Sequence, residues 1–176
     1  MKQVIFRYGL YGTIAIAILG CIHSFWLMPP RISWEAAEVV GYLTMILPMI
    51  FIFMGIRYYR DHVNNGALSF GEGLKIGVLM VLLPAVFFGL FNVLYIEVLD
   101  PSFTDNYYNY QLEKIKTATP GDQLEEKLKQ MQKDKETFSK PVYQFLFMAG
   151  IVFVIGLIVT IISSLTLRRN KSTASA

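Results

Sequence analysis

Long stretches without a formal charge alternate with short polar segments along the chain. Such stretches run through residues 9–28, 39–56, 76–96 and 141–167. Each is close to the ~20 residues that a helix needs to cross about 30 Å of hydrocarbon. The pattern predicts an all-α integral membrane four-helix bundle with transmembrane helices at approximately 8–28, 37–59, 70–98 and 141–167.

The polar segment between the second and third predicted helices is short and favours a tight turn. Residues 64–66 are Asn-Asn-Gly, and both residue types tolerate a positive φ angle at low cost. Ser69 and Glu72 then have the spacing of a capping box, in which each side chain accepts a backbone N–H at the start of a helix. We therefore expect two membrane-spanning helices joined by this turn.

Glycines recur on the third and fourth predicted helices, at positions 71, 73, 77, 150 and 156. The first three have the spacing G-x-G-x-x-x-G with no strand before them, which differs from the dinucleotide-binding fingerprint. Small residues let membrane helices approach closely. We expect these glycines to mark helix–helix contacts, together with Thr160, Ser163 and Ser164.

The segment 102–139 is polar but keeps an apolar periodicity. Two series of apolar residues follow helical spacing: Phe103, Tyr107, Tyr110 and Ile115, then Leu124, Leu128, Met131 and Phe138. Between the two series, Thr119-Pro120-Gly121-Asp122 is a helix-start signal. The segment is predicted to form two antiparallel helices of about 16 residues, or ~25 Å, each. This hairpin would protrude from the membrane between transmembrane helices 3 and 4.

Two prolines and one amide interrupt the apolar stretches. Pro48 predicts a kink, with the Thr44 hydroxyl available to the backbone carbonyl that Pro48 leaves free. Pro84 and Asn92 lie in the third predicted helix. A polar residue such as Asn92 marks either a solute path or an interhelical hydrogen bond. Pattern alone leaves open whether Pro48, Pro84 and Asn92 serve function or structure.

The first predicted helix is interpreted as an uncleaved anchor. Its uncharged stretch exceeds the ~7 to 15 apolar residues of a signal peptide, and it ends at Pro29-Pro30, which cannot continue a helix. The residues Ile18-Leu19-Gly20-Cys21 loosely resemble a lipoprotein cleavage box and remain a minor alternative. As the one cysteine of the chain, Cys21 excludes an intrachain disulfide.

Composition agrees with a membrane protein. Of the 176 residues, 54% are hydrophobic and 16% are charged, against about a quarter charged in soluble domains. The net charge of +3 is modest, and the basic residues flank apolar stretches instead of gathering on one surface. Nucleic-acid binding is therefore not expected.

Basic residues near the helix ends predict the orientation. The loop 29–33 carries Arg31, whereas the opposite side of the predicted threading carries Lys2, Arg7, Arg57, Arg60, Lys75, Arg168, Arg169 and Lys171. The positive-inside rule then places both termini in the cytoplasm and the loop 102–139 in the periplasm. The seven lysines between 114 and 140 bring the basic residues on the periplasmic side to eight, the same number as on the cytoplasmic side. The net charge still differs, at +6 inside against −3 outside.

The sequence contains no arrangement typical of an enzyme. An intramembrane enzyme needs an activated nucleophile or a metal cluster. His23 and His62 fall toward opposite faces of the membrane, and Cys21, two residues from His23, points to another side of its helix. We expect a protein without enzymatic activity and without a catalytic, cofactor-binding or metal site.

Four segments carry a resemblance to a known family: GYLTMI at 41–46, GIRYYRD at 55–61, NGALSFG at 65–71 and GLIVTIIS at 156–163. In these segments the chain resembles a family of small, uncharacterised, Bacteroidetes-type four-helix membrane proteins known as a domain of unknown function. The resemblance covers nearly the whole chain. It implies four spanning helices in a bacterial inner membrane, and it implies no activity, ligand or catalytic residue.

These observations together favour a single multi-pass membrane domain, residues 1–176, that is a structural or interaction component of the bacterial inner membrane. Its expected partners are the lipid bilayer and, through the 102–139 hairpin, another protein or a second copy. The alternative is a small oligomeric transporter or channel, suggested by Pro48, Pro84 and Asn92. That alternative requires a dimer, because four helices are few for a transport path.

Overall fold

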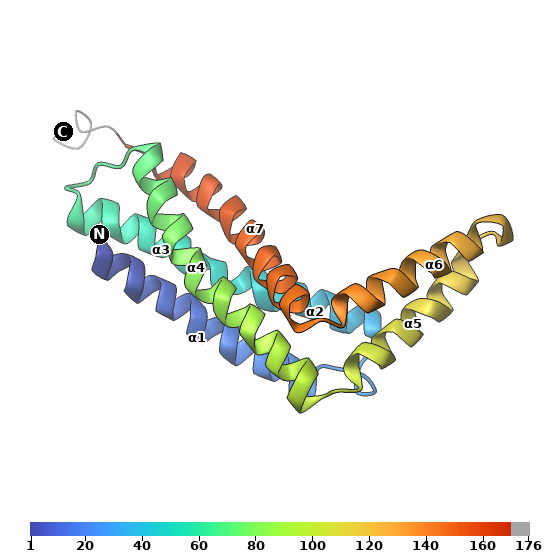
Figure 1. Ribbon diagram of the computed structural model, residues 1–176. Coiled ribbons are helices and arrows are strands. Elements are labelled where there is room, and N and C mark those ends of the chain that lie inside the picture. The colour runs from blue at the N-terminus through green and yellow to red at the C-terminus, as the bar shows by residue number, and fades with distance from the viewer. Residues whose placement is uncertain (170–176) are drawn as a thin grey trace. The chain divides into compact units, whose positions relative to one another are not determined.

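The computed structural model describes residues 1–169, apart from the side chain of Asp122. Lys171, counted above among the basic residues, lies outside this range. The regular elements are α1 (Lys2–Trp26), α2 (Trp34–Ile46), η1 (Leu47–Met49), α3 (Ile50–Tyr58), η2 (Tyr59–Val63), α4 (Phe70–Leu94), η3 (Tyr95–Leu99), α5 (Phe103–Ala118), α6 (Gly121–Phe138) and α7 (Pro141–Leu167) (Figure 1). Within the described range the elements are all helical, which confirms the predicted fold class.

Four helical stretches are long and apolar enough to cross a membrane: Lys2–Trp26, Trp34–Val63, Phe70–Leu99 and Pro141–Leu167. They correspond to the four predicted spans. The first begins at Lys2, earlier than predicted, because the charged side chains of Lys2 and Arg7 can reach solvent from a helix end without breaking its backbone hydrogen bonds.

The chain divides into two compact units. Unit 1 comprises Met1–Phe88 and the chain from Ala149 onward, and unit 2 comprises Gly89–Met148. Unit 1 thus holds α1, α2 and α3 with most of α4 and α7. Unit 2 holds the end of α4, then η3, α5 and α6, and the start of α7.

Helix α1 buries a stripe of small residues in unit 1. Its buried positions are Val4, Gly9, Gly12, Ile16 and Gly20. A Cβ atom added to Gly9 would lie 3.2 Å from the carbonyl oxygen of Met80 in α4. The backbones of α1 and α4 therefore approach closely, which requires a residue without a side chain.

Helices α4 and α7 pack in unit 1 through small residues, as predicted. A Cβ atom on Gly73 would lie 2.7 Å from Ser164 Oγ, and one on Gly77 would overlap the side chain of Thr160. The Thr160 hydroxyl donates to the carbonyl of Gly156, and the Ser164 hydroxyl donates to the carbonyl of Thr160, each at 2.7 Å. Both hydroxyls therefore have hydrogen-bond partners within α7. Thr160 and Ser164 can be small residues at the contact with α4 without leaving a hydroxyl unpaired.

Two of the predicted glycine contacts are wrong. Nothing lies within 4 Å of a Cβ atom added to Gly71 or Gly150, whereas one added to Gly156 would lie 2.6 Å from Val81 Cγ1. Spacing alone does not distinguish these glycines, because an almost wholly apolar helix gives no periodic signal for the face that packs.

The second span is interrupted where the sequence predicts a kink. Pro48 lies in η1, a turn of 3-10 helix between α2 and α3. The Thr44 hydroxyl donates to the carbonyl of Gly41 at 2.7 Å. It does not donate to the carbonyl that Pro48 leaves free, so this part of the prediction is wrong. Ser33 caps the start of α2, since its Oγ accepts the backbone N–H of Ala36.

The connection before α4 has the predicted turn and capping box. Asn65 and Gly66 have φ angles of 51° and 77°. The N–H of Ser69 donates to Glu72 Oε2 at 2.9 Å, and the N–H of Glu72 donates to Ser69 Oγ at 3.3 Å. An isolated antiparallel bridge joins Leu68 in this connection to Arg169, just beyond α7.

Helices α5 and α6 form an antiparallel pair in unit 2 (Figure 1). The residues of the two predicted apolar series are half-buried, and no large apolar side chain of these two helices is exposed among the described residues. Helix α6 begins at Gly121 and not at Pro120, which precedes the helix with extended backbone. Extension away from a membrane remains a prediction for this pair.

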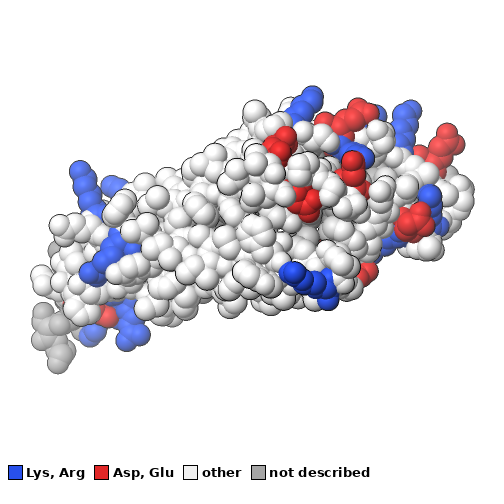
Figure 2. All heavy atoms as spheres, turned by 90° about the horizontal axis from the view of Figure 1, so that it is seen from below, with Lys and Arg blue, Asp and Glu red and all other residues white. Residues whose placement is uncertain are grey.

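Exposed apolar side chains cover the spanning helices. Among them are Phe6, Ile14, Ile158 and Ile162, which are 48 to 61% exposed. On the face in Figure 2, blue residues gather at the end of unit 1 near the chain termini, and residues of both charges cover the α5–α6 pair. Surfaces of this kind are stable in lipid, whereas water would leave a large apolar area exposed.

Candidate functional site

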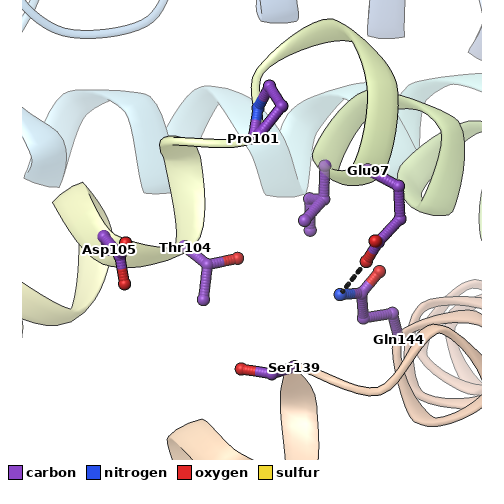
Figure 3. Close-up of a pocket in the computed structure, with 7 residues that line it drawn as sticks. Glu97, Pro101, Thr104, Asp105, Ser139 and Gln144 are labelled. Atoms are coloured by element: carbon purple, nitrogen blue, oxygen red, sulfur yellow. Dashed lines mark hydrogen bonds between the residues drawn. The ribbon is translucent and has the colours of Figure 1, made fainter.

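Unit 2 contains a pocket of about 210 Å³ that is open to the surface. Seven residues line it: Ile96, Glu97, Pro101, Thr104, Asp105, Ser139 and Gln144. They come from η3, the connection that follows it, the first turn of α5, the end of α6 and the first turn of α7. Figure 3 shows Glu97 and Gln144 on one side of the pocket, with Thr104 and Ser139 facing it from the others.

A chain of aromatic rings holds η3 against α5 beside this pocket. Tyr95 contacts Phe103 with ring centroids 5.7 Å apart, and Phe103 stacks on Tyr107 at 6.1 Å. The Ser102 hydroxyl donates to Asp100 Oδ1 at 2.6 Å, which orders the connection between the two helices. Together these contacts fix the position from which Glu97 and the first turn of α5 reach the pocket.

Glu97 and Gln144 are joined by a hydrogen bond across the pocket wall. Gln144 Nε2 donates to Glu97 Oε1 at 3.0 Å (Figure 3). Glu97 is exposed and also accepts this hydrogen bond. Gln144 was not recognised from the sequence, although it is the one Asn or Gln residue within 141–167.

The other end of the Gln144 amide has no partner. The side chain is 4% exposed, and its Oε1 atom is buried without a hydrogen bond. A buried acceptor that lacks a donor costs about 1–3 kcal/mol. Native proteins leave few such groups, and an unaccompanied one often marks the place of a water, an ion or a ligand.

The second carboxylate of the pocket already has a cation beside it. Lys135 Nζ lies 2.7 Å from Asp105 Oδ1 and 5.9 Å from the ring centroid of Tyr108. Burial raises the pKa of the Tyr108 phenol, and the negative charge of Asp134 raises it further. Tyr108 is therefore a neutral ring at physiological pH, against which the Lys135 ammonium can lie.

The structure separates the polar and proline residues singled out in the sequence. Asn92 lies in unit 2, and its buried Oδ1 atom has no hydrogen-bond partner. Pro84 lies in unit 1, where its Cγ atom is 4.0 Å from a Cβ added to Gly12. Pro84 thus fills the groove of a helix contact in unit 1, and Pro48 occupies a different element, η1.

The histidines and the cysteine are not gathered into one site. His23 Nε2 donates to the carbonyl of Ala37 at 2.9 Å, and the His62 ring stacks on Tyr58 at 4.5 Å. Cys21 is a free, half-buried thiol. Within residues 1–169, no three or more His, Cys, Asp and Glu side chains are grouped so that they could hold a metal ion.

Comparison with known proteins supplies a family and no activity. No curated protein and no solved structure matches the chain. A family match extends over residues 7–169, nearly the whole chain, and therefore includes the pocket and all four apolar helices except the first turn of α1. This chain belongs to the family described as Protein of unknown function (DUF4199).

Proposed function

We propose that the protein is a multi-pass component of the bacterial inner membrane that acts by binding another protein and catalyses no reaction. The supporting observation is the α5–α6 pair, on which no large apolar side chain is exposed while most charged side chains are exposed. Lys129 and Lys133 are exposed on α6, and Glu113 is exposed on α5. Such a surface suits specific polar contacts more than insertion into lipid.

The orientation is part of this proposal. Both termini lie in the cytoplasm and the α5–α6 pair lies in the periplasm, as the basic residues near the helix ends favour. Alkaline phosphatase, which is active only outside the cytoplasm, is expected to be active when fused after Gly121 and inactive when fused after Asn65. The reverse pattern would overturn the orientation.

Photo-crosslinking in living cells tests the contact surface. A benzophenone amino acid at Lys129, exposed on α6, is expected to yield a protein adduct of discrete mass. The matched control at Ile162, exposed on the apolar face of α7, is expected to react with lipid alone. An adduct of twice the chain mass would identify a second copy, and another mass would identify a different protein.

The crosslinking result can also reject the proposal. Protein adducts at Ile162 but not at Lys129, nor at a second exposed α6 position such as Lys133, would move the contact surface to the spanning helices. Both α6 positions are exposed, so failure at both cannot be attributed to a buried probe.

One observation favours the alternative of an oligomeric transporter. The Asn92 oxygen is buried without a partner within the uncharged stretch 76–96, and polar groups inside a membrane commonly serve a solute path. Under this alternative, Asn92→Leu abolishes solute flux in proteoliposomes while the protein stays folded. An absence of flux through the wild-type protein would instead support the binding role.

A further inference from the structure

We propose that the pocket of unit 2 binds a primary ammonium group. Its lining presents oxygen atoms from five side chains: the carboxylates of Glu97 and Asp105, the hydroxyls of Thr104 and Ser139, and the amide of Gln144. An ammonium group carries three N–H donors and no acceptor. It therefore matches a lining of this kind, and this inference goes beyond the protein-binding role proposed above.

The charges of the pocket leave room for one cation. Asp105 Oδ1 lies 2.7 Å from Lys135 Nζ, so the charge of Asp105 is already balanced by an ammonium group of the chain itself. Glu97 receives the neutral amide of Gln144, at 3.0 Å. The three ionised side chains thus leave one negative charge on Glu97, and a monovalent cation would neutralise it.

The unpaired oxygen of Gln144 indicates independently that a hydrogen-bond donor is missing beside it. The side chain is 4% exposed and lines the pocket, and its oxygen has no partner. Figure 3 shows its amide beside the Glu97 carboxylate at the pocket wall. In the structure this oxygen is buried and Nε2 faces Glu97. An ammonium group that replaced this hydrogen bond would donate to Glu97, and a half-turn of the amide would bring the Gln144 oxygen beside it as a second acceptor.

A divalent metal ion fits this lining less well. Calcium takes about six to eight oxygen ligands, and magnesium demands near-ideal octahedral geometry. In the described part of the chain, no cluster of three or more acidic, histidine or cysteine side chains is arranged for a metal. A volume of about 210 Å³ also exceeds the ~30 Å³ share of one water molecule, so a small organic cation can enter.

Two sources can deliver a primary ammonium to this place. Glu97 lies in the last turn of the apolar stretch Phe70–Leu99, and Gln144 lies in the first turn of Pro141–Leu167. Helix ends of this kind lie at the headgroup level of a bilayer, where phosphatidylethanolamine carries such a group. A free amine from the aqueous side has the same chemistry.

The test uses the full-length protein in phosphatidylcholine nanodiscs, labelled with ¹⁵N-glutamine. Loss of one signal in Gln144→Leu assigns the side-chain amide resonance of Gln144. Ethanolamine is expected to shift this resonance if the pocket takes a free amine. Phosphatidylethanolamine added to the nanodiscs shifts it, without a response to ethanolamine, if the pocket takes a lipid headgroup.

The variant Glu97→Gln tests the charge while keeping an oxygen that can accept the Gln144 amide. Its affinity for the responding amine is expected to fall by at least about 10-fold, the loss of one charged hydrogen-bond partner. The control Glu126→Gln removes the same charge from an exposed α6 residue outside the pocket and is expected to leave the affinity unchanged.

Several results would overturn the proposal. One is the absence of a response to both ethanolamine and phosphatidylethanolamine. Another is equal binding by Glu97→Gln and the wild-type protein. An equal response to tetramethylammonium, which has no N–H donor, or a tighter response to magnesium or calcium chloride, would reject the ammonium group as the ligand.

Discussion

The four long apolar helices and the α5–α6 pair pack with different kinds of side chain. In the apolar helices of unit 1 the closest contacts are made by residues with little or no side chain, such as Gly9, Gly73 and Gly77, while many large apolar residues are exposed. In the α5–α6 pair the large apolar residues are half-buried and most charged residues are exposed. The apolar helices and the α5–α6 pair thus suit different solvents.

The difference follows from which interactions stabilise a helix contact in lipid and which do so in water. Lipid tails are as apolar as leucine, so burying leucine between two membrane helices gains little, and close backbone packing becomes the main attraction. In water, covering apolar area is itself favourable, at about 25 cal/mol per Å². Membrane-spanning helices and a solvated helix pair should therefore respond oppositely to the same kind of substitution.

The largest effect is expected from Gly77→Ala. The new methyl group would overlap the Thr160 side chain, so we expect a loss of about 3 kcal/mol in the free energy of unfolding. Thermal unfolding in detergent would measure it. The control Gly150→Ala adds the same methyl group where no atom lies within 4 Å, and an equal loss in both variants would contradict the packing explanation.

A smaller effect is expected from Leu128→Asp, which places a charge in the apolar contact between α5 and α6. Burying a polar group without a partner costs about 2 kcal/mol in protein mutational data. Amide hydrogen exchange should accelerate within residues 103–138 and stay unchanged in the spanning helices. Lys129→Asp, on the exposed side of the same helix, serves as the control, and equal exchange in both variants would count against a solvated pair.

Ser69→Ala is expected to cost about 1 kcal/mol, the usual contribution of an N-cap. The substitution removes the oxygen that accepts the N–H of Glu72 at the start of α4. Thermal unfolding would again report the change. Ser69→Thr keeps the hydroxyl and should retain most of the stability, whereas equal destabilisation by both substitutions would point away from capping.

The smallest effect is expected from Ile162→Ala. This side chain is 58% exposed on α7, where lipid takes the place of water, so its truncation should change the free energy of unfolding within the membrane by less than about 0.5 kcal/mol. Ile56→Ala, at a position with no exposure, should cost about 2 kcal/mol, because it leaves a cavity between packed helices. Similar losses at both positions would contradict the expected difference between lipid-facing and packed residues.

Local signals in the sequence were sufficient where neighbouring residues decide the structure. The turn at 64–66 and the capping box of Ser69 and Glu72 were both predictable, because each depends on a few adjacent groups. The contacts of Gly71 and Gly150 were predicted wrongly. Which face of an apolar helix packs is decided by other helices, so spacing does not reveal it.

The candidate site could not be found in the same way. Glu97 and Gln144 are separated by 47 positions and come together only through the fold of unit 2. The sequence showed Gln144 as a single amide near one end of an apolar stretch, and nothing local connected it with Glu97. A hydrogen bond between such distant positions is a property of tertiary structure alone.

The sequence by itself determined that four stretches of this chain are apolar helices and that residues 102–139 are amphipathic, since length, charge and periodicity act locally along the chain. Tertiary structure decided which glycines pack, which hydroxyls pair within their own helix, and which oxygen of Gln144 is left without a donor. The reason is physical: hydrophobic burial follows composition, whereas packing and hydrogen bonding depend on the positions of atoms from distant parts of the chain.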